Sequence, residues 1–136
     1  MGDARADAWG GARAEPPLVL VIDDDPDART ICERTLRAAG YRTATVASGP
    51  EALARIGDLR PALVVLDLAM PGTDGMGVLR ALRAQPALAA TPILVFSGLA
   101  GDAEERAREA GGSAFCQKPI EPRRFLDQVR QLCPPR

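Results

Sequence analysis

Acidic, hydroxyl and amino side chains follow four separate apolar runs of this sequence. Asp67 ends an apolar run that breaks shortly afterwards at a Pro-Gly pair. Asp23 and Asp24 end an earlier run, Ser97 ends a later one, and Lys118 ends the last. Carboxylates, a hydroxyl and an ammonium group suit a site that handles a phosphoryl group together with a divalent cation.

Clustered carboxylates repel one another, and a hard divalent cation relieves this repulsion. Mg²⁺ prefers oxygen ligands, keeps several waters, and takes one or two carboxylates plus a phosphate oxygen. We expect Asp24 and Asp67 to be direct ligands and Asp23 to act through a water, with Mn²⁺ as an alternative metal. Lys118 would pair with one phosphoryl oxygen and Ser97 would donate a hydrogen bond to another. The expected product of such a site is an aspartyl phosphate.

Each of these residues could also have an ordinary structural role. Asp25 is expected to cap a helix, which leaves the two acids before it without such a role. Ser97 could serve a turn, Lys118 could be an exposed turn lysine, and Asp67 could cap a loop. These separate roles need four independent coincidences, whereas one phosphoryl site accounts for all four positions.

Five apolar runs predict the strands that position these residues. Three of them are continuous Val, Ile and Leu segments, which is typical of the central strands of a parallel sheet covered on both faces. The predicted strands are Leu18–Ile22, Tyr41–Val46, Ala62–Leu66, Pro92–Phe96 and Ser113–Gln117.

Helix signals separate these strands. The predicted helices run from Pro26, capped by Asp25, to Gly40; from the capping box Ser48-Gly49-Pro50-Glu51 to about Gly57; from Asp74-Gly75, with Val78, Leu79 and Leu82 buried; from Asp102 to Gly111-Gly112; and from Glu121-Pro122, with Phe125, Val129 and Leu132 at helical spacing. Alternating strands and helices predict a doubly wound α/β sheet. Its strands end along one edge, where ligands bind, so we expect the four functional positions to converge there.

Composition limits the possible functions. The chain has 136 residues, enough for one domain, with an expected flexible extension over 1–16, a folded domain over 17–133 and a tail over 134–136. A net charge of −1 without a basic stripe argues against direct nucleic-acid binding. No apolar stretch approaches the roughly 20 residues of a membrane span, and the amino terminus lacks a signal-peptide core, so we expect a cytoplasmic protein.

Histidine and cysteine usage narrows the chemistry further. The chain contains no histidine, which excludes a phosphohistidine in this chain, a Ser-His-Asp triad and a histidine-ligated metal. Three widely spaced cysteines argue against a structural zinc site or a disulfide framework. Cys116 is expected in the core, and Cys133 is expected to be exposed near the carboxyl terminus.

From Leu18 to Leu132 the chain resembles a receiver domain of the bacterial response-regulator family. The resemblance implies a flavodoxin-like five-stranded sheet in the order 2-1-3-4-5 with five helices. The matching motifs are Leu20-Val21-Ile22-Asp23-Asp24-Asp25-Pro26, the segment from Leu66 to Gly75, Val95-Phe96-Ser97-Gly98 and Lys118-Pro119.

The resemblance also implies roles for individual residues. Asp67 would be the phosphoacceptor, and the backbone carbonyl of Ala69 would complete the protein's metal ligands. Ser97 and Phe115 would be the switch hydroxyl and the switch aromatic residue. A cis peptide bond is expected before Pro119. The stretch between Ser97 and Lys118 is one residue shorter than usual for the family, so we expect a short or displaced fourth helix.

The implied function is a signalling switch, not a turnover enzyme. A histidine kinase or phosphotransfer protein would phosphorylate Asp67, and the surface of the fourth helix, fifth strand and fifth helix would then change for an unidentified protein partner. We expect a monomer or weak dimer that catalyses only its own phosphorylation and dephosphorylation. The cognate kinase and the downstream target stay open.

Two alternatives compete with this function. The first is a haloacid-dehalogenase-type phosphatase, whose D-x-D motif would use Asp23 as nucleophile and Asp25 as general acid. Pro26 in place of the usual Thr or Val, and the absence of an acidic pair after Lys118, argue against it. The second is a receiver-shaped interaction module that is never phosphorylated, for which the acids and Lys118 would have no purpose.

Overall fold

The computed structural model describes residues 15–98 and 101–135 of the chain. Residues 1–14, 99–100 and 136 lie outside the described part, and so does almost all of the extension expected over 1–16. The domain limits at residues 16/17 and 133/134 stay a prediction.

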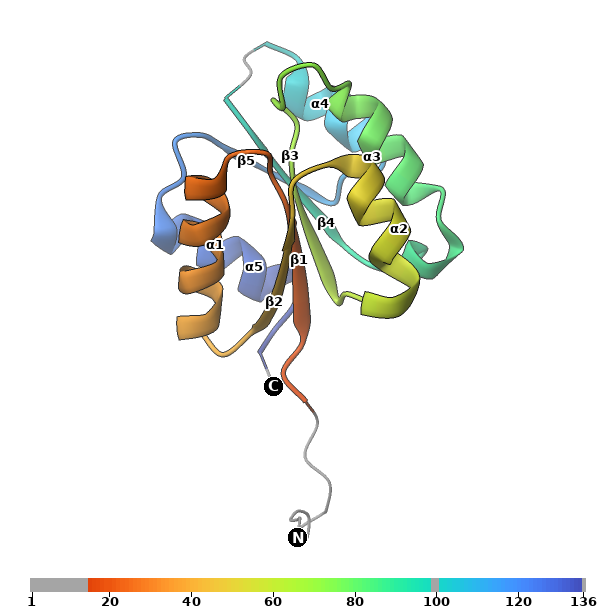
Figure 1. The fold of residues 1–136 in the computed structure, drawn as a ribbon. Coiled ribbons are helices and arrows are strands. Elements are labelled where there is room, and N and C mark those ends of the chain that lie inside the picture. Colours follow the sequence, from red (N-terminus) through yellow and green to blue (C-terminus); the bar gives the residue numbers. More distant parts are fainter. Residues whose placement is uncertain (1–14, 99–100, 136) are drawn as a thin grey trace, which may run out of the picture.

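The described residues form a five-stranded parallel sheet with connecting helices (Figure 1). The strands are ordered β2-β1-β3-β4-β5, which confirms the expected flavodoxin-like order. In chain order the elements are β1 (Leu18–Ile22), α1 (Pro26–Ala38), β2 (Arg42–Val46), α2 (Gly49–Leu59), β3 (Leu63–Asp67), α3 (Gly75–Arg83), a 3₁₀ turn η1 (Pro86–Leu88), β4 (Ile93–Ser97), α4 (Ala103–Glu109), β5 (Ala114–Gln117) and α5 (Pro122–Leu132).

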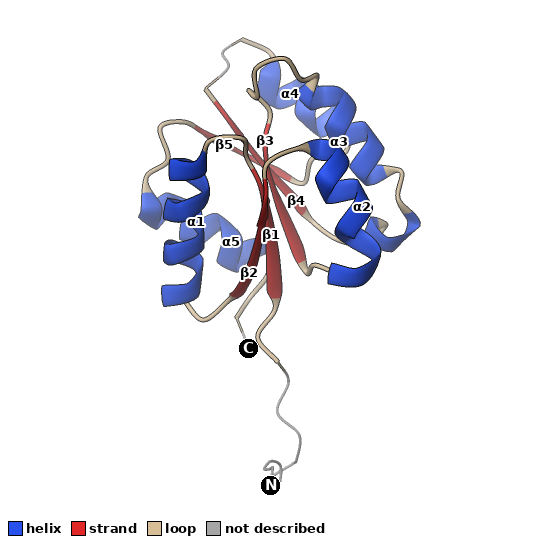
Figure 2. Ribbon diagram, viewed as in Figure 1, coloured by secondary structure: helices blue, strands red, loops and turns tan. Residues whose placement is uncertain are grey.

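Helices cover both faces of the sheet (Figure 2). Helices α1 and α5 pack on one face, where Leu36 and Phe125 are buried. Helices α2, α3 and α4 pack on the other, where Ile56 and Leu79 are buried. Every residue of β1, β3 and β4 is buried. Strands that are enclosed on both sides need apolar residues at successive positions, which explains the continuous Val, Ile and Leu runs.

The register of the strands brings their carboxyl ends into line. Ile22 of β1 lies opposite Leu66 of β3, and Asp67 lies opposite Phe96 of β4. Ser97 lies opposite Gln117 of β5. Residues that end or follow β1, β3, β4 and β5 therefore meet at one edge of the sheet.

The predicted helix starts are correct, with one difference in detail. The Asp25 carboxylate accepts a hydrogen bond from the Asp27 N–H and caps α1. Ser48 Oγ accepts from the Glu51 N–H, but the Glu51 carboxylate accepts from the Ala47 N–H, one residue before the position that a capping box uses.

The second helix is longer than predicted. It continues through Gly57 to Leu59 and ends where Arg60 adopts a left-handed conformation with φ of 48°. Pro61 follows, and a proline disfavours helical geometry at the residue before it, so the stop signal is Pro61 and not Gly57. The expectation of a short fourth helix is confirmed, because α4 spans only Ala103–Glu109.

The expected exposure of Cys133 is wrong, whereas Cys116 is buried as predicted. Cys133 is 7% exposed, and its carbonyl accepts a hydrogen bond of 2.6 Å from the buried Tyr41 hydroxyl. This bond joins the end of α5 to the residue before β2, 92 positions earlier in the chain. The end of α5 is therefore part of the buried cluster on the face of the sheet that α1 and α5 cover.

One arginine joins several segments at the opposite edge of the sheet from Asp67. The Arg83 guanidinium donates hydrogen bonds of 2.8 to 3.0 Å to the main-chain carbonyls of Leu88, Thr91 and Gly111. It thereby ties the end of α3 to η1, to the approach to β4 and to the turn after α4. The sequence patterns did not predict this role.

Within the described residues, no helix has the length and apolar character needed to cross a membrane.

Candidate functional site

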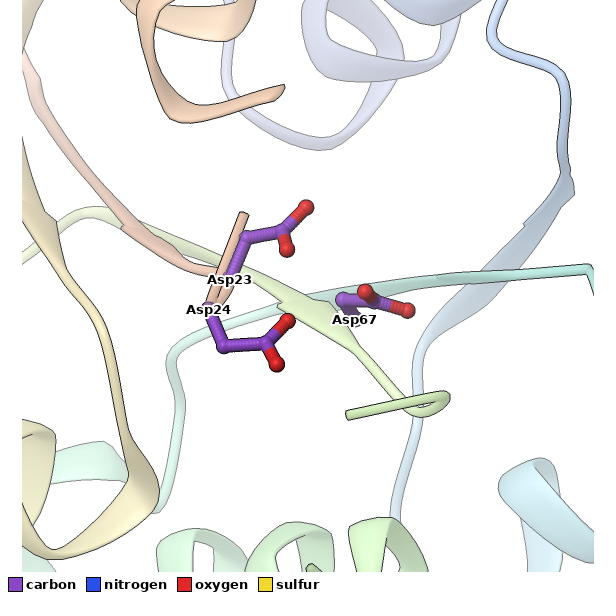
Figure 3. Close-up of side chains that lie close together, drawn as sticks. All are labelled: Asp23, Asp24 and Asp67. Atoms are coloured by element: carbon purple, nitrogen blue, oxygen red, sulfur yellow. The ribbon is translucent and has the colours of Figure 1, made fainter. Parts of the chain in front are cut away.

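Three carboxylates converge at the carboxyl edge of the sheet (Figure 3). One oxygen from each of Asp23, Asp24 and Asp67 lies within 4.8 Å of the others. Asp23 and Asp67 are buried, whereas Asp24 is exposed. Asp67 ends β3, and the two other acids directly follow β1, so the parallel sheet brings together residues more than 40 positions apart.

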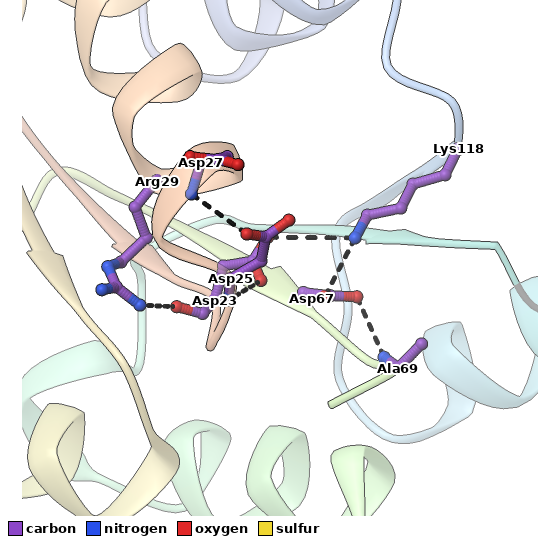
Figure 4. A network of polar contacts seen from close by, with 7 residues as sticks. All are labelled: Asp23, Asp25, Asp27, Arg29, Asp67, Ala69 and Lys118. Carbon is purple, nitrogen blue, oxygen red and sulfur yellow. Dashed lines mark hydrogen bonds and ion pairs between the residues drawn. The ribbon is translucent and has the colours of Figure 1, made fainter. Parts of the chain in front are cut away.

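Asp67 is held by two hydrogen bonds, one to each carboxylate oxygen (Figure 4). Lys118 Nζ donates to Oδ2 at 3.0 Å, and the Ala69 N–H donates to Oδ1 at 2.9 Å. Lys118 Nζ also lies 3.8 Å from Asp23 Oδ2 and 5.0 Å from the centre of the Phe96 ring. The ammonium group therefore bridges the two buried carboxylates, with an aromatic ring on one side of it.

Asp23 is the buried member of the cluster that has a carboxylate oxygen without a hydrogen bond. Its Oδ1 accepts a hydrogen bond of 3.0 Å from the Asp25 N–H, but its buried Oδ2 accepts none. Burial, and to a lesser extent the neighbouring Asp67 carboxylate, raise the pKa of Asp23 from 3.8 to about 6.

The cluster fits a hard divalent cation. A buried carboxylate oxygen without a hydrogen-bond donor is costly, and so are two adjacent negative charges. A cation that prefers oxygen ligands would relieve both costs, while the exposed Asp24 leaves one side of the cluster open to water. The residues present therefore suit the metal that the sequence predicts.

A glycine fixes the loop that leaves Asp67. A Cβ at Gly75 would overlap the main chain of Leu68, so the start of α3 packs against the residue directly after Asp67. Ala69 is exposed, and its N–H holds Asp67. The expected role of its carbonyl as a metal ligand stays a prediction.

The two predicted switch residues occupy different places. Ser97 is fully buried at the end of β4, the strand next to Asp67. Phe115 is half-buried in β5, one strand further away, and packs against the apolar cluster under α2, α3 and α4. Gln128 of α5 donates a hydrogen bond of 3.1 Å to the Phe115 carbonyl. The peptide bond between Lys118 and Pro119 is cis, as expected.

Sequence patterns do not reveal two residues near the site. Arg29 in α1 donates a hydrogen bond of 2.8 Å to the Asp23 carbonyl. The only signal for it is a basic residue six positions after Asp23, a spacing that is common by chance. Gly75 is visible in the sequence only as part of a helix start, because a close approach of two main chains, such as its contact with Leu68, leaves no local pattern.

Asp25 does not lie where the phosphatase alternative needs its general acid. The Asp25 carboxylate is exposed and caps α1, so it is directed at the helix and not at the acidic cluster. The cluster instead combines Asp23 and Asp24 with Asp67, which the D-x-D motif does not include.

Comparison with known proteins gives a consistent result. A sequence profile of the response regulator receiver domain matches residues 19–130. The DNA-binding response regulator MtrA of Mycolicibacterium smegmatis is 34% identical over 113 residues, which are 82% of this chain and 48% of that protein. The transcriptional regulatory protein PrrA of Mycobacterium tuberculosis is 38% identical over 117 residues, 85% of this chain and 49% of that protein. The chain thus spans about half the length of these curated relatives.

Solved structures share the fold over nearly their whole length. The chemotaxis protein CheY4 of Vibrio cholerae has a TM-score of 0.80 and 29% identity, with 85% of this chain and 98% of that chain covered. The receiver domain of the sensor histidine kinase PA1611 of Pseudomonas aeruginosa PAO1, with a magnesium ion coordinated in its active site cleft, has a TM-score of 0.76 and 28% identity. The match between the two structures covers 85% of this chain and 96% of the PA1611 receiver domain chain. With its strand order, acidic cluster and these matches, the chain belongs to the response regulator receiver domain family of two-component systems.

Proposed function

We propose that Asp67 accepts a phosphoryl group in a reaction that depends on Mg²⁺. The observation that carries the proposal is the shared geometry of three carboxylates and one ammonium group, in which Lys118 contacts Asp67 and the buried Asp23 Oδ2 accepts no hydrogen bond. Asp24 and Asp67 would bind the cation directly, Asp23 through a water, and Ala69 through its carbonyl. The magnesium ion in the active site cleft of the related PA1611 receiver domain supports this assignment.

In the proposed transfer, an Asp67 carboxylate oxygen attacks the phosphorus of a phosphohistidine. The new P–O bond forms as the P–N bond breaks, and the departing imidazole nitrogen keeps the bonding electron pair and takes up a proton. A bound divalent cation would offset the negative charge of the carboxylates and of the phosphoryl oxygens. Lys118, which contacts Asp67 Oδ2 at 3.0 Å, would shift to a phosphoryl oxygen, and Ser97 would donate a hydrogen bond to another.

A histidine kinase or phosphotransfer protein is the proposed donor. Among the described residues, Ile31 on α1 is the one exposed large hydrophobic side chain, with 55% exposure. It lines a pocket of about 250 Å³ together with Asp25, Asp27, Lys118 and Ile120. The apolar contact area of Ile31 and Ile120 near Lys118, which contacts Asp67, suits a protein donor, since a small phosphodonor would gain little from it. This donor chemistry also makes the cytoplasm the proposed location.

The proposed output is a change in the surface of α4, β5 and α5. The new phosphoryl group would draw Ser97 toward it, and Phe115 would turn into the space that opens. Beryllofluoride, which mimics the phosphoryl group, tests this step together with Mg²⁺. We expect amide chemical-shift changes in α4, β5 and α5, and an unchanged spectrum of this surface would contradict the switch.

Intact mass spectrometry after incubation with acetyl phosphate and Mg²⁺ tests the central proposal. We expect the mass of one phosphoryl group to be added to the wild type and to be absent from Asp67→Asn. Asp58→Asn, which changes an exposed helix carboxylate, is the matched control and should still be modified. A wild type that stays unmodified would favour the interaction module that is never phosphorylated.

A further inference from the structure

Arg29 reaches from α1 back to the peptide group that joins Asp23 and Asp24. Its Nη1 donates a hydrogen bond of 2.8 Å to the Asp23 carbonyl, and the contact is partly buried (Figure 4). Among the described residues, Arg29 forms no ion pair with a carboxylate. Its guanidinium is therefore directed at the main chain.

The hydrogen bond from Arg29 is one of three that hold Asp23 in place. The Asp23 N–H donates to the Val46 carbonyl at 3.2 Å, and Asp23 Oδ1 accepts from the Asp25 N–H at 3.0 Å. Together with the Arg29 bond, these contacts hold the main chain of Asp23 on both sides and also its side chain.

Asp24 is held quite differently. Its side chain is exposed, and none of the described residues donates a hydrogen bond to its carboxylate. No contact with a described residue directs the Asp24 carboxylate, so the main chain determines where its Cα–Cβ bond points. The Asp23–Asp24 peptide plane, from which this bond starts, is the plane that Arg29 holds.

We infer that Arg29 is a positioning residue that directs the Asp24 carboxylate toward the cation site. Arg29 itself touches neither the cation nor the phosphoryl group in this role. The inference rests on the proposed function, in which Asp24 is a direct metal ligand. It assigns to Arg29 the part that outer-shell hydrogen bonds have in other metal sites, which is to orient a ligand before the metal binds.

Positioning and simple electrostatics predict opposite signs when Arg29 is replaced. A cation close to the acidic cluster repels Mg²⁺, so removing its charge should strengthen metal binding. Loss of orientation should weaken it, because Asp24 would then have to be ordered at the moment of binding. The sign of the change in Mg²⁺ affinity thus separates the two.

The test is a Mg²⁺ titration of Arg29→Met and of Arg34→Met. Binding is measured by calorimetry and by the amide NMR signals of Asp24 and Asp67. Arg34 is exposed on the same helix and forms no hydrogen bond or ion pair with a described residue, so its variant controls for the lost charge. We expect the Mg²⁺ dissociation constant to rise about 10-fold in Arg29→Met, as for lost outer-shell partners. Arg34→Met should bind as well as the wild type, or slightly better.

Two further variants complete the design. Arg29→Lys keeps the charge and one donor, and should fall between wild type and Arg29→Met. If Arg29→Met does not fold by circular dichroism, Arg29→Gln removes the same charge with a polar side chain, and the same weakening is expected.

Unchanged or tighter Mg²⁺ binding in Arg29→Met, or in Arg29→Gln where that replaces it, would overturn the positioning role while leaving the proposed function intact. Failure of the wild type to bind Mg²⁺ would refute the metal site, and the positioning role with it.

Discussion

Replacing Asp23 by Asn should stabilise the metal-free fold, and the gain should grow as the pH rises. Asp23 is fully buried, and its pKa is raised from 3.8 to about 6, first by burial and then by the Asp67 carboxylate. Between these two values the folded state binds more protons than the unfolded state, so the wild type loses stability as the pH rises through this window. Asn cannot ionise and avoids this loss.

The size of the effect follows from the two pKa values. The difference between about 6 and 3.8 is about 2.2. At roughly 1.36 kcal/mol for each pKa unit, ionisation of Asp23 lowers the free energy of unfolding by about 3 kcal/mol near pH 7.5 and by about 1 kcal/mol near pH 4.5. The advantage of Asp23→Asn should therefore grow by about 2 kcal/mol between these pH values. The new amide oxygen can still accept the hydrogen bond from the Asp25 N–H.

Urea unfolding at both pH values, with a chelator present, measures this change. Asp25→Asn is the matched control, because it removes an exposed carboxylate two residues away and keeps a good helix cap. Added Mg²⁺ should stabilise the wild type more than Asp23→Asn and reduce the difference, since the cation favours the ionised carboxylate. A difference that does not change with pH, or a wild type that is more stable near pH 7.5, would refute the reasoning.

Three further substitutions test contacts that only the tertiary structure contains, each by urea unfolding. Tyr41→Phe removes the buried 2.6 Å hydrogen bond to the Cys133 carbonyl and should cost about 1 kcal/mol; no loss would mean that water replaces the hydroxyl. Arg83→Met leaves three carbonyls without their donor and should cost about 2 kcal/mol or more, with faster amide exchange in the turn after α4; slow exchange there would contradict the role of Arg83. Gly75→Ala should cost about 1–3 kcal/mol because its Cβ overlaps the Leu68 main chain, and a neutral result would show that the loop after Asp67 can shift freely.

Much of the fold follows from local features of the sequence. Strand positions are correct to within a residue or so. The signal is clearest for β1, β3 and β4, because a strand enclosed on both faces must be apolar at successive positions. Asp25, Ser48 and Asp74 each mark a helix start, because their side chains accept hydrogen bonds from the first turn of the helix. Such signals act over a few residues, so they are visible without the fold.

The composition of the acidic cluster was also predictable. Once parallel strands are expected, the rule that their carboxyl ends share an edge places Asp23, Asp24 and Asp67 together. The exposure of Cys133 was predicted wrongly because nearness to the chain end says little about packing. The actual burial depends on how α5 lies against α1.

The sequence by itself thus determined which residues make up the acidic cluster, and the tertiary structure decided how they are held. Lys118 contacts Asp67 across 51 residues, and Arg29 reaches the Asp23 carbonyl from the following helix. The raised pKa of Asp23 likewise depends on complete burial next to a second carboxylate. Desolvation and long-range hydrogen bonds arise only when the helices close over the sheet, and no local periodicity encodes them.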